Sequence, residues 1–162
     1  HRWKRISLLI DAMRYVRAPI GLKIAGEGEE ASRLRALPSG DDRVVFLGGI
    51  SRDAVLDAYA DALAVPFVPI GEDFGFVTAE AFASGKPVIT CRDSGEPSRL
   101  VRDGRTGFVC PPRPKALAAR IESLAADPSR AASMGLRARD SARPRSWEDI
   151  GASLLGALGW TP

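Results

Sequence analysis

One stretch, residues 65–90, constrains the fold of this 162-residue chain more than any other. Apolar residues at 64–68 lead through a polar loop at 71–73 into a run of helix formers at 74–84, and β-branched residues follow at 88–90. Gly85 stands where a helix commonly ends, and Pro66 and Pro69 predict a first strand that is short or lies near a sheet edge. Strand, helix and strand in this order predict a right-handed parallel βαβ unit.

The start of the predicted helix suits an anionic ligand. Asp73 is the expected N-cap, and Gly75, Phe76 and Val77 form the first turn. The free backbone N–H groups of a first turn, at the positive end of the helix dipole, favour a phosphate group. Gly75 also has no side chain that would keep an anion away. Because ligands of parallel α/β folds bind at the carboxyl ends of the strands, this helix start is the expected binding place.

Two carboxylates flank this helix start, Glu72 in the loop and Glu80 in the second helical turn. A carboxylate repels a bound pyrophosphate, so both are expected to face neutral hydroxyl groups. A ribose and a hexose supply such hydroxyls on either side of a diphosphate. Taken alone, two acids at this spacing would be interpreted as solvated loop and helix residues.

The chain resembles a known family in EDFGFVTAEAFASGKPVIT, in the later DSGEPSRLVRDGRTGFVCPP and in KRISLLIDA near the start. Glu72 and Glu80 match the E-x7-E signature of retaining glycosyltransferases with the GT-B fold, the glycosyl transferases group 1 family. The resemblance covers nearly the whole chain, but only the family's C-terminal, donor-binding half. It implies one nucleotide-sugar-binding domain over residues 1–162, with the N-terminal acceptor domain absent. The implied fold is α/β, with a Rossmann-like parallel sheet flanked by helices.

The resemblance also implies roles for single residues. Glu72 would contact the transferred sugar, and Lys4 would neutralise the pyrophosphate as a flexible point charge, so these two are the catalytic candidates. Glu80 would hold the ribose hydroxyls. For Lys4, the plain alternative is a lysine on an exposed N-terminal turn.

Two further loops are assigned to the donor by their position. Gly48 to Ile50 matches the loop whose backbone reads the nucleobase in the family, and Gly26 follows a short strand expected at 20–25. Backbone contacts leave no side-chain signature, so the base cannot be identified from the sequence. The alternative for Gly26 is a simple strand-to-helix connection, because the third glycine of a dinucleotide fingerprint is missing.

The predicted function is that of a glycosyltransferase donor domain. It would bind a UDP- or GDP-sugar, from which a hexosyl group passes to an acceptor hydroxyl with retention. The acceptor, a glycan or a lipid-linked molecule, would bind to the missing domain, so this part alone is expected to be inactive. The resemblance implies catalysis without a metal, and no carboxylate cluster in the sequence suggests one. No cofactor is expected, since the nucleotide sugar is a substrate. The alternative is a non-catalytic module, derived from such a domain, that binds nucleotide or a partner subunit.

One loop departs from the pattern of the relatives. They tend to have a second glycine at position 96 and a glutamate at position 99, where this chain has Glu96 and Arg99. In the family this loop lies near the donor sugar, so the departure leaves the sugar unidentified and keeps the non-catalytic alternative open. In the plain interpretation, Arg99 pairs with Glu96 across i,i+3.

Composition limits the remaining possibilities. Hydrophobic residues make up 45% and charged residues 27% of the chain, as in an ordinary globular protein, and no apolar run approaches a membrane span of ~20 residues. The net charge of +3 is mild and no nucleic-acid motif is present, so no nucleic-acid partner is predicted. Cys91 and Cys110 are interpreted as buried small hydrophobes in a reducing cytoplasm.

The C-terminal part is expected to be helical and basic. Helices are predicted at 115–126, 129–142 and 147–158. The basic residues are Arg130, Arg137, Arg139, Arg143 and Arg145. A solvated helix face is the plain interpretation, and peripheral contact with anionic lipid at the inner face of the membrane is the alternative.

The remaining predicted elements complete an alternating pattern. They are a helix at 5–16, strands at 20–25 and 43–47, a helix at 52–60 capped by Ser51, a helical turn at 98–102, a tight turn at 103–107 and a strand at 108–110. Alternation of this kind predicts one parallel α/β sheet. In the family a central strand precedes the helix near Lys4, and this sequence starts after it. Either that strand is lacking or something else takes its place.

Overall fold

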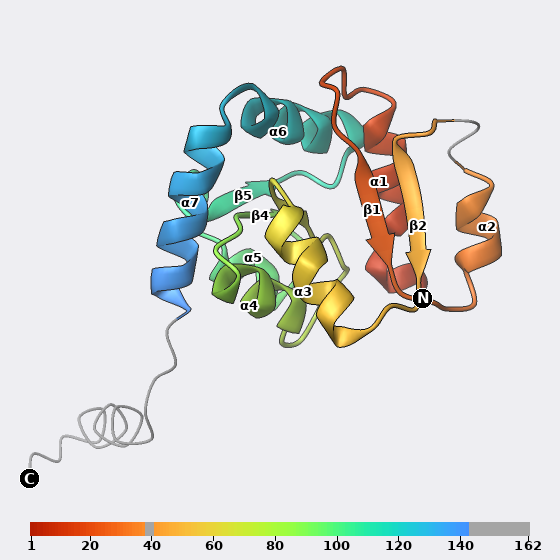
Figure 1. Ribbon diagram of the computed structural model, residues 1–162, viewed down its shortest axis with the longest axis horizontal. Helices are drawn as coiled ribbons and strands as arrows, with labels where there is room; N and C mark the ends of the chain where they lie inside the picture. Colours follow the sequence, from red (N-terminus) through yellow and green to blue (C-terminus); the bar gives the residue numbers. More distant parts are fainter. Residues whose placement is uncertain (38–40, 143–162) are drawn as a thin grey trace, which may run out of the picture.

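The computed structural model describes residues 1–37 and 41–142. Helices and strands alternate along the chain up to β5, and two longer helices follow (Figure 1). The helices are η1 (Arg2–Lys4), α1 (Ile6–Met13), α2 (Ala31–Arg35), α3 (Arg52–Asp61), α4 (Phe76–Ala83), α5 (Glu96–Leu100), α6 (Pro114–Ala126) and α7 (Pro128–Ser141). The strands are β1 (Leu22–Ala25), β2 (Val44–Gly48), β3 (Val65–Pro66), β4 (Val88–Cys91) and β5 (Gly107–Cys110). The helix predicted at 147–158 lies outside the described residues, as do Arg143 and Arg145.

Most predicted elements are present, with ends shifted by a few residues. Helix α1 ends at Met13 rather than at residue 16, and α5 begins two residues before the predicted helical turn. Two short helices, η1 and α2, were not predicted. They have three and five residues, too few to show the 3.6-residue periodicity on which a helix prediction depends.

The strands are parallel, but they form two sheets rather than the single predicted one. β1 pairs with β2, and β3, β4 and β5 form a second sheet in that order. Within residues 1–37 and 41–142 no further strand pairs with β1 or β3, so none of these residues supplies the central strand implied by the resemblance. The alternation of helices and strands in the sequence predicts the α/β class correctly, but it does not show whether the strands form one sheet or two.

The predicted βαβ unit is confirmed. β3 and β4 are parallel neighbours joined by α4, with Val65 paired to Val88 and Pro66 to Ile89. β3 is only two residues long and lies at the edge of its sheet, as its prolines predict. A proline lacks the N–H that an inner strand must donate, so the edge is where it can be accommodated.

The end of α4 also agrees with the sequence. Gly85 has a φ of 67°, which is left-handed and costs glycine little. Its N–H donates to the carbonyl of Phe82 at 2.9 Å, and the next N–H, of Lys86, donates to the carbonyl of Ala81 at 2.8 Å. These two bonds form a Schellman motif, which ends the helix and directs the chain into β4.

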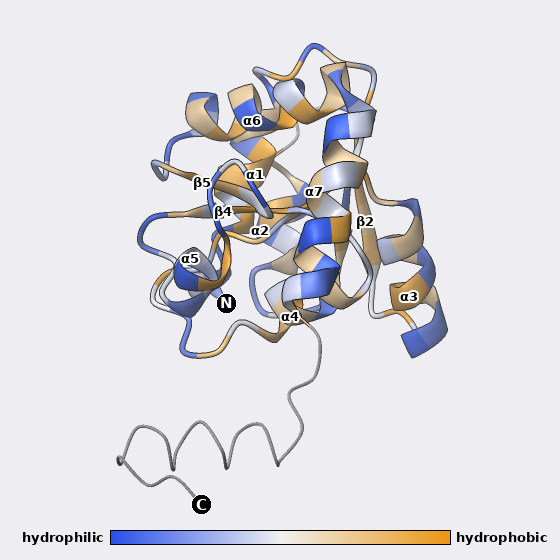
Figure 2. Ribbon diagram, turned by 90° about the vertical axis from the view of Figure 1, so that its left-hand side faces the viewer, coloured by the Kyte–Doolittle hydropathy of each residue, from blue (hydrophilic) through white to orange (hydrophobic). Residues whose placement is uncertain are grey.

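One hydrophobic core connects the two sheets. β4 is buried at all four positions, whereas β1 and β2 are only partly buried. Figure 2 shows the strands mostly in hydrophobic colours and the helices with mixed faces. The largest buried helical side chains of this core are Ile10, Met13, Leu117, Leu124 and Met134. Each contributes roughly 1.5–3 kcal/mol by burial.

The two cysteines are free and buried, and they occupy paired positions on β4 and β5. The Sγ of Cys110 donates a hydrogen bond to the carbonyl of Thr90 at 3.4 Å. Their interpretation as small core residues is therefore confirmed.

Candidate functional site

Two loops meet at the carboxyl ends of β3 and β4. The N–H of Gly71 donates to the Asp93 carbonyl at 2.9 Å. The N–H of Glu72 donates to the Ser94 carbonyl at 3.2 Å. At Gly95 the two backbones are so close that an added Cβ would lie 2.4 Å from the carbonyl oxygen of Glu72. The backbone of Glu72 is therefore fixed by the neighbouring loop before any ligand binds.

Lys4 and Glu72 form an ion pair, with Nζ and Oε2 2.6 Å apart. They are 68 residues apart in the sequence. The turn that carries Lys4 is attached to the same loop, because the N–H of Ile70 donates to the carbonyl of Trp3 at 2.8 Å. The side chains of Lys4 and Glu72 remain 44% and 26% exposed, so a ligand can reach both.

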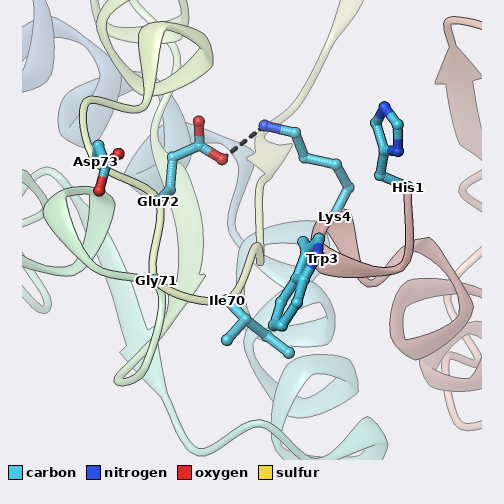
Figure 3. Close-up of a pocket in the computed structure, with 7 residues that line it drawn as sticks. All are labelled: His1, Trp3, Lys4, Ile70, Gly71, Glu72 and Asp73. Carbon is cyan, nitrogen blue, oxygen red and sulfur yellow. Dashed lines mark hydrogen bonds and ion pairs between the residues drawn. The ribbon is translucent and has the colours of Figure 1, made fainter.

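A surface pocket of about 460 Å³ lies beside this ion pair (Figure 3). The η1 turn and the loop after β3 line it with His1, Trp3, Lys4, Ile70, Gly71, Glu72 and Asp73. Lys4 and Glu72 point toward each other, and the indole of Trp3 lies beside Ile70 (Figure 3). The two catalytic candidates thus share one pocket, which the predicted donor-binding residues do not line.

The prediction that Asp73 caps α4 is wrong. The helix begins at Phe76, its N-cap is Gly75, and no side chain bonds to the cap. Asp73 comes two residues too early and lines the pocket instead. Gly75 is required for a different reason than the one expected. Its φ is 73°, and an added Cβ would lie 2.7 Å from the Cγ of Pro97.

The first turn of α4 keeps free hydrogen-bond donors. The N–H groups of Phe76 and Val77 have no intrahelical acceptor at this position. The hydroxyl of Thr78 is buried and has no hydrogen-bond partner among the described residues. The exposed rings of Phe74 and Phe76 lie against each other, with centroids 4.5 Å apart. This helix start therefore offers donors and an aromatic surface, which suit a ligand with both charged and ring-shaped parts.

Glu80 lies exposed on α4 and accepts a hydrogen bond of 2.9 Å from the Tyr59 hydroxyl of α3. Burial, and then the neighbouring Glu80 carboxylate, raise the pKa of Tyr59 above its ordinary value. The bond holds Oε2, so Oε1 remains available to a ligand. The sequence gave no sign of this bond, because the partners belong to different elements.

The three other predicted donor residues lie at the carboxyl ends of β1 and β2. The N–H of Gly26 donates to the carbonyl of Gly48 at 2.8 Å, so these two loops touch directly. Glu27 accepts from the N–H of Gly49 at 3.2 Å. Ile50 follows, half-buried. The structure groups these residues with one another at the ends of the two-stranded sheet.

The sequence did not identify the residue next to Lys4. Arg5 forms a bidentate ion pair with Asp93, with two contacts of 2.8 Å. Hydrogen bonding and charge from Arg5 lower the pKa of Asp93 below its ordinary value of 3.8. A lysine–arginine pair followed by an apolar helix was the only sequence signal, and it does not reveal the partner.

The interpretation of residues 96 and 99 is confirmed. Arg99 Nη1 lies 3.6 Å from Glu96 Oε2 within α5, and the arginine side chain is largely exposed. This is an ordinary i,i+3 pair, so neither residue is buried or strained by the departure from the family pattern.

The sequence profile of glycosyl transferases group 1 matches residues 1–141. The chain belongs to this family. Its fold is that of the C-terminal half of a GT-B glycosyltransferase. It superposes on Anabaena HepE in complex with UDP and glucose with a TM-score of 0.81 at 25% identity, covering 98% of this chain and 46% of that one.

Curated proteins with glycosyltransferase names are also similar to this chain. The chain is 33% identical to the GDP-mannose-dependent alpha-(1-6)-phosphatidylinositol monomannoside mannosyltransferase of Mycolicibacterium smegmatis, over 94% of this chain and 44% of that protein. It is 40% identical to the D-inositol 3-phosphate glycosyltransferase of Mycolicibacterium gilvum, over 73% of this chain and 26% of that protein. The chain therefore spans less than half the length of these relatives. In the described residues no helix is both long and apolar enough to cross a membrane.

Proposed function

We propose that this chain is the donor-binding domain of a retaining glycosyltransferase, and that a UDP- or GDP-sugar lies across the Lys4–Glu72 pocket and the start of α4. The observation that carries the proposal is the pairing of Lys4 with Glu72 next to the start of α4. The pocket supplies a cation, Lys4, and a carboxylate, Glu72, and the start of α4 supplies free N–H donors. A diphosphate needs the first two, and a sugar with its hydroxyls suits the third.

Lys4, the start of α4 and the two glutamates would act in sequence as the donor binds and the nucleotide leaves. A diphosphate would compete with Glu72 for the ammonium of Lys4, which is free to swing because it is a point charge on a flexible chain. The first-turn N–H groups of α4 would share the phosphate charge. Together they would stabilise the nucleotide as it leaves, when its negative charge increases. Glu72 would then face the sugar, where positive charge develops, and Glu80 would bind the ribose.

The two classes of nucleotide are both supported by relatives. HepE has been crystallised in complex with UDP-glucose, and the mycobacterial mannosyltransferase is GDP-mannose-dependent. The loops at Gly26, Gly48 and Ile50 would read the base. The mannosyltransferase acts on a phosphatidylinositol mannoside, which favours a lipid-linked acceptor bound by another part of the protein and contact with the cytoplasmic face of a membrane.

The rest of the reaction would depend on the acceptor domain. Transfer needs donor and acceptor within a few ångströms, and such positioning accounts for ~7–11 kcal/mol of a barrier. We therefore expect residues 1–162 to bind nucleotide without transferring sugar to any acceptor.

Calorimetric titration of this chain with UDP and with GDP tests the proposal. At least one should bind, and Glu80→Ala should weaken it by about 1.5–3 kcal/mol, the range for a hydrogen bond to a charged group. Asp57→Ala, which removes an exposed acid from α3, serves as the control and should leave the affinity unchanged. No binding of either nucleotide at millimolar concentration would favour the non-catalytic partner-binding alternative.

A further inference from the structure

Arg5 has a backbone conformation that residues with a side chain rarely adopt. Its φ of 49° and ψ of 39° are left-handed, and it is the one non-glycine residue with a positive φ in the described part of the chain. It closes the η1 turn, since its N–H donates to the carbonyl of Arg2 at 3.0 Å, and it is also the N-cap of α1. Glycine would avoid the conformational cost at this corner, so the side chain of Arg5 must compensate for it.

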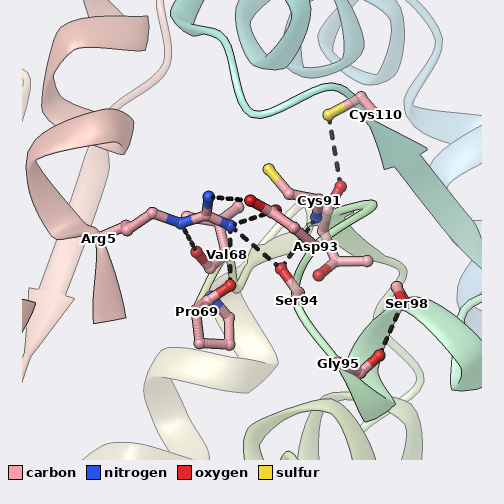
Figure 4. Close-up of polar contacts among 10 residues, drawn as sticks. Arg5, Val68, Pro69, Cys91, Asp93, Ser94, Gly95, Ser98 and Cys110 are labelled. Carbon is pink, nitrogen blue, oxygen red and sulfur yellow. Dashed lines mark hydrogen bonds and ion pairs between the residues drawn. The ribbon is translucent and has the colours of Figure 1, made fainter. Parts of the chain in front are cut away.

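The guanidinium makes that compensation through a full set of contacts (Figure 4). Nε donates to the carbonyl of Val68 at 2.6 Å, and Nη2 to the carbonyl of Pro69 at 2.8 Å. Nη1 and Nη2 each reach an oxygen of Asp93 at 2.8 Å, and Nη2 lies 3.5 Å from Oγ of Ser94. The side chain is only 14% exposed. A planar fork with five donors can satisfy this arrangement, and an ammonium cannot.

These contacts support both partners of the ion pair indirectly, through the backbone that carries each of them. Asp93 and Ser94 belong to the loop whose carbonyls accept the N–H groups of Gly71 and Glu72, so Arg5 supports Glu72 through that loop. Lys4 is the residue before Arg5, and its direction depends on the left-handed corner. The guanidinium of Arg5 therefore supports the turn that carries Lys4 and the loop that holds Glu72.

We propose that Arg5 is a positioning residue, whose guanidinium fixes the backbone segments that carry Lys4 and Glu72, so that the two side chains are placed to receive the diphosphate of the donor. The inference rests on the proposed function, because it assigns that arrangement to a nucleotide sugar. Arg5 itself does not touch the ligand, since its donors are already occupied by Val68, Pro69 and Asp93.

Arg5→Gly is the decisive variant, because it removes the guanidinium with the rest of the side chain while glycine adopts the left-handed corner readily. Its affinity for UDP or GDP, measured by calorimetry, should fall by about tenfold or more. Millimolar guanidinium ion should restore part of that affinity by filling the space beside Asp93, and the same concentration of potassium chloride should not. Arg5→Lys should stay impaired, because it keeps the charge but loses the fork.

Arg43 provides a matched control. It also combines an aspartate with two backbone carbonyls: Nε and Nη2 reach Asp41 at 2.9 and 2.8 Å, and the other contacts are to Val16 at 2.8 Å and Met13 at 3.0 Å. This clamp lies just before β2, at the opposite end of that strand from Gly48. Arg43→Gly should lower the unfolding midpoint in urea but leave nucleotide affinity unchanged.

A measurement made without nucleotide tests the role of Arg5 independently of the proposed function. The double-mutant cycle of Lys4→Met and Glu72→Gln measures their coupling from urea unfolding. That coupling should be lost in the Arg5→Gly background and kept in the Arg43→Gly background. If the parent binds neither UDP nor GDP, the proposed function fails and the cycle still decides whether Arg5 positions the pair.

Two results would overturn the inference. One is an Arg5→Gly variant with the parent's Lys4–Glu72 coupling. The other is equal loss of nucleotide affinity in Arg5→Gly and Arg43→Gly at equal loss of stability, which would make Arg5 an ordinary structural residue.

Discussion

The three-stranded and the two-stranded sheet present loops at their carboxyl ends in different ways. β4 is buried at every position, and the loops after β3 and β4 are joined by backbone hydrogen bonds and by Arg5. β1 and β2 are only partly buried, and the loops after them meet through the Gly26–Gly48 bond and the Glu27–Gly49 contact.

The difference matches the roles proposed for the two regions. The charged pair Lys4 and Glu72 lies on the three-stranded side, where its geometry is fixed by buried structure. The two-stranded side offers mainly backbone groups, which need only approach a base. Electrostatic groups gain most from being held in place before the ligand arrives, so they suit the region built on the more deeply buried strand.

The largest effect is expected from Gly107→Ala in β5. An added Cβ would lie 2.0 Å from the carbonyl oxygen of Val88, so β4 and β5 would have to separate. We expect a loss of more than about 4 kcal/mol in the free energy of unfolding, measured with urea. Gly28→Ala on the other side is the control, because its added Cβ would meet only the N-terminal nitrogen at 3.8 Å. Equal losses in both variants would remove the contrast between the two regions.

Truncation of one apolar side chain in each sheet tests the same contrast between the buried and the partly buried strands. Ile89 in β4 is 1% exposed, whereas Val45 in β2 is 46% exposed. Ile89→Ala should cost about 3 kcal/mol, because it leaves a cavity in a buried sheet. Val45→Ala should cost less than about 1 kcal/mol. Urea unfolding of both variants measures the difference, and an equal loss at Val45 would contradict the contrast in burial between β2 and β4.

Tyr59→Phe tests the bond by which α3, which follows the two-stranded sheet, reaches α4. Its hydroxyl holds Glu80, so the variant should lose about 0.5–1.5 kcal/mol of stability and bind nucleotide a few-fold more weakly. Tyr15→Phe is the control, because Tyr15 is an exposed tyrosine whose ring contact with Lys115 survives the change. Unchanged stability and affinity in Tyr59→Phe would show that Glu80 needs no partner.

The smallest effect concerns pH and the two arginine–aspartate pairs. The pKa of Asp93 is lowered by Arg5, and that of Asp41 by Arg43. A lowered pKa stabilises the folded state above the ordinary value of 3.8, and the gain is lost as pH falls through the lower, folded value. Asp93→Asn should therefore lose under about 1 kcal/mol at pH 7, and its difference from the parent should shrink below about pH 4.

Asp41→Asn is the matched control for that pH series. It should show the same trend in urea unfolding and leave nucleotide affinity unchanged, whereas Asp93→Asn should weaken binding. A stability difference for Asp93→Asn that persists to pH 2 would contradict the assigned direction of the shift.

Local chemistry in the sequence determined much of this molecule. The prolines at 66 and 69 predicted a short edge strand, Gly85 ended α4, and Ser51 caps α3 by accepting from the N–H of Ala54 at 3.2 Å. Each of these depends on residues within a few positions of one another. The family also followed from the sequence, because its signature keeps Glu72 and Glu80 at a fixed spacing.

Only the tertiary structure decided how these parts meet. Arg5 and Asp93 are 88 residues apart, and Lys4 and Glu72 are 68 apart, so no local pattern could pair them. The division into two sheets depends on which strands find a hydrogen-bonded neighbour, not on any strand alone. The wrong cap at Asp73 has the same cause. The left-handed Gly75 takes the cap position, where Pro97 leaves no space for a side chain, and the approach of so distant a residue has no signature in the nearby sequence.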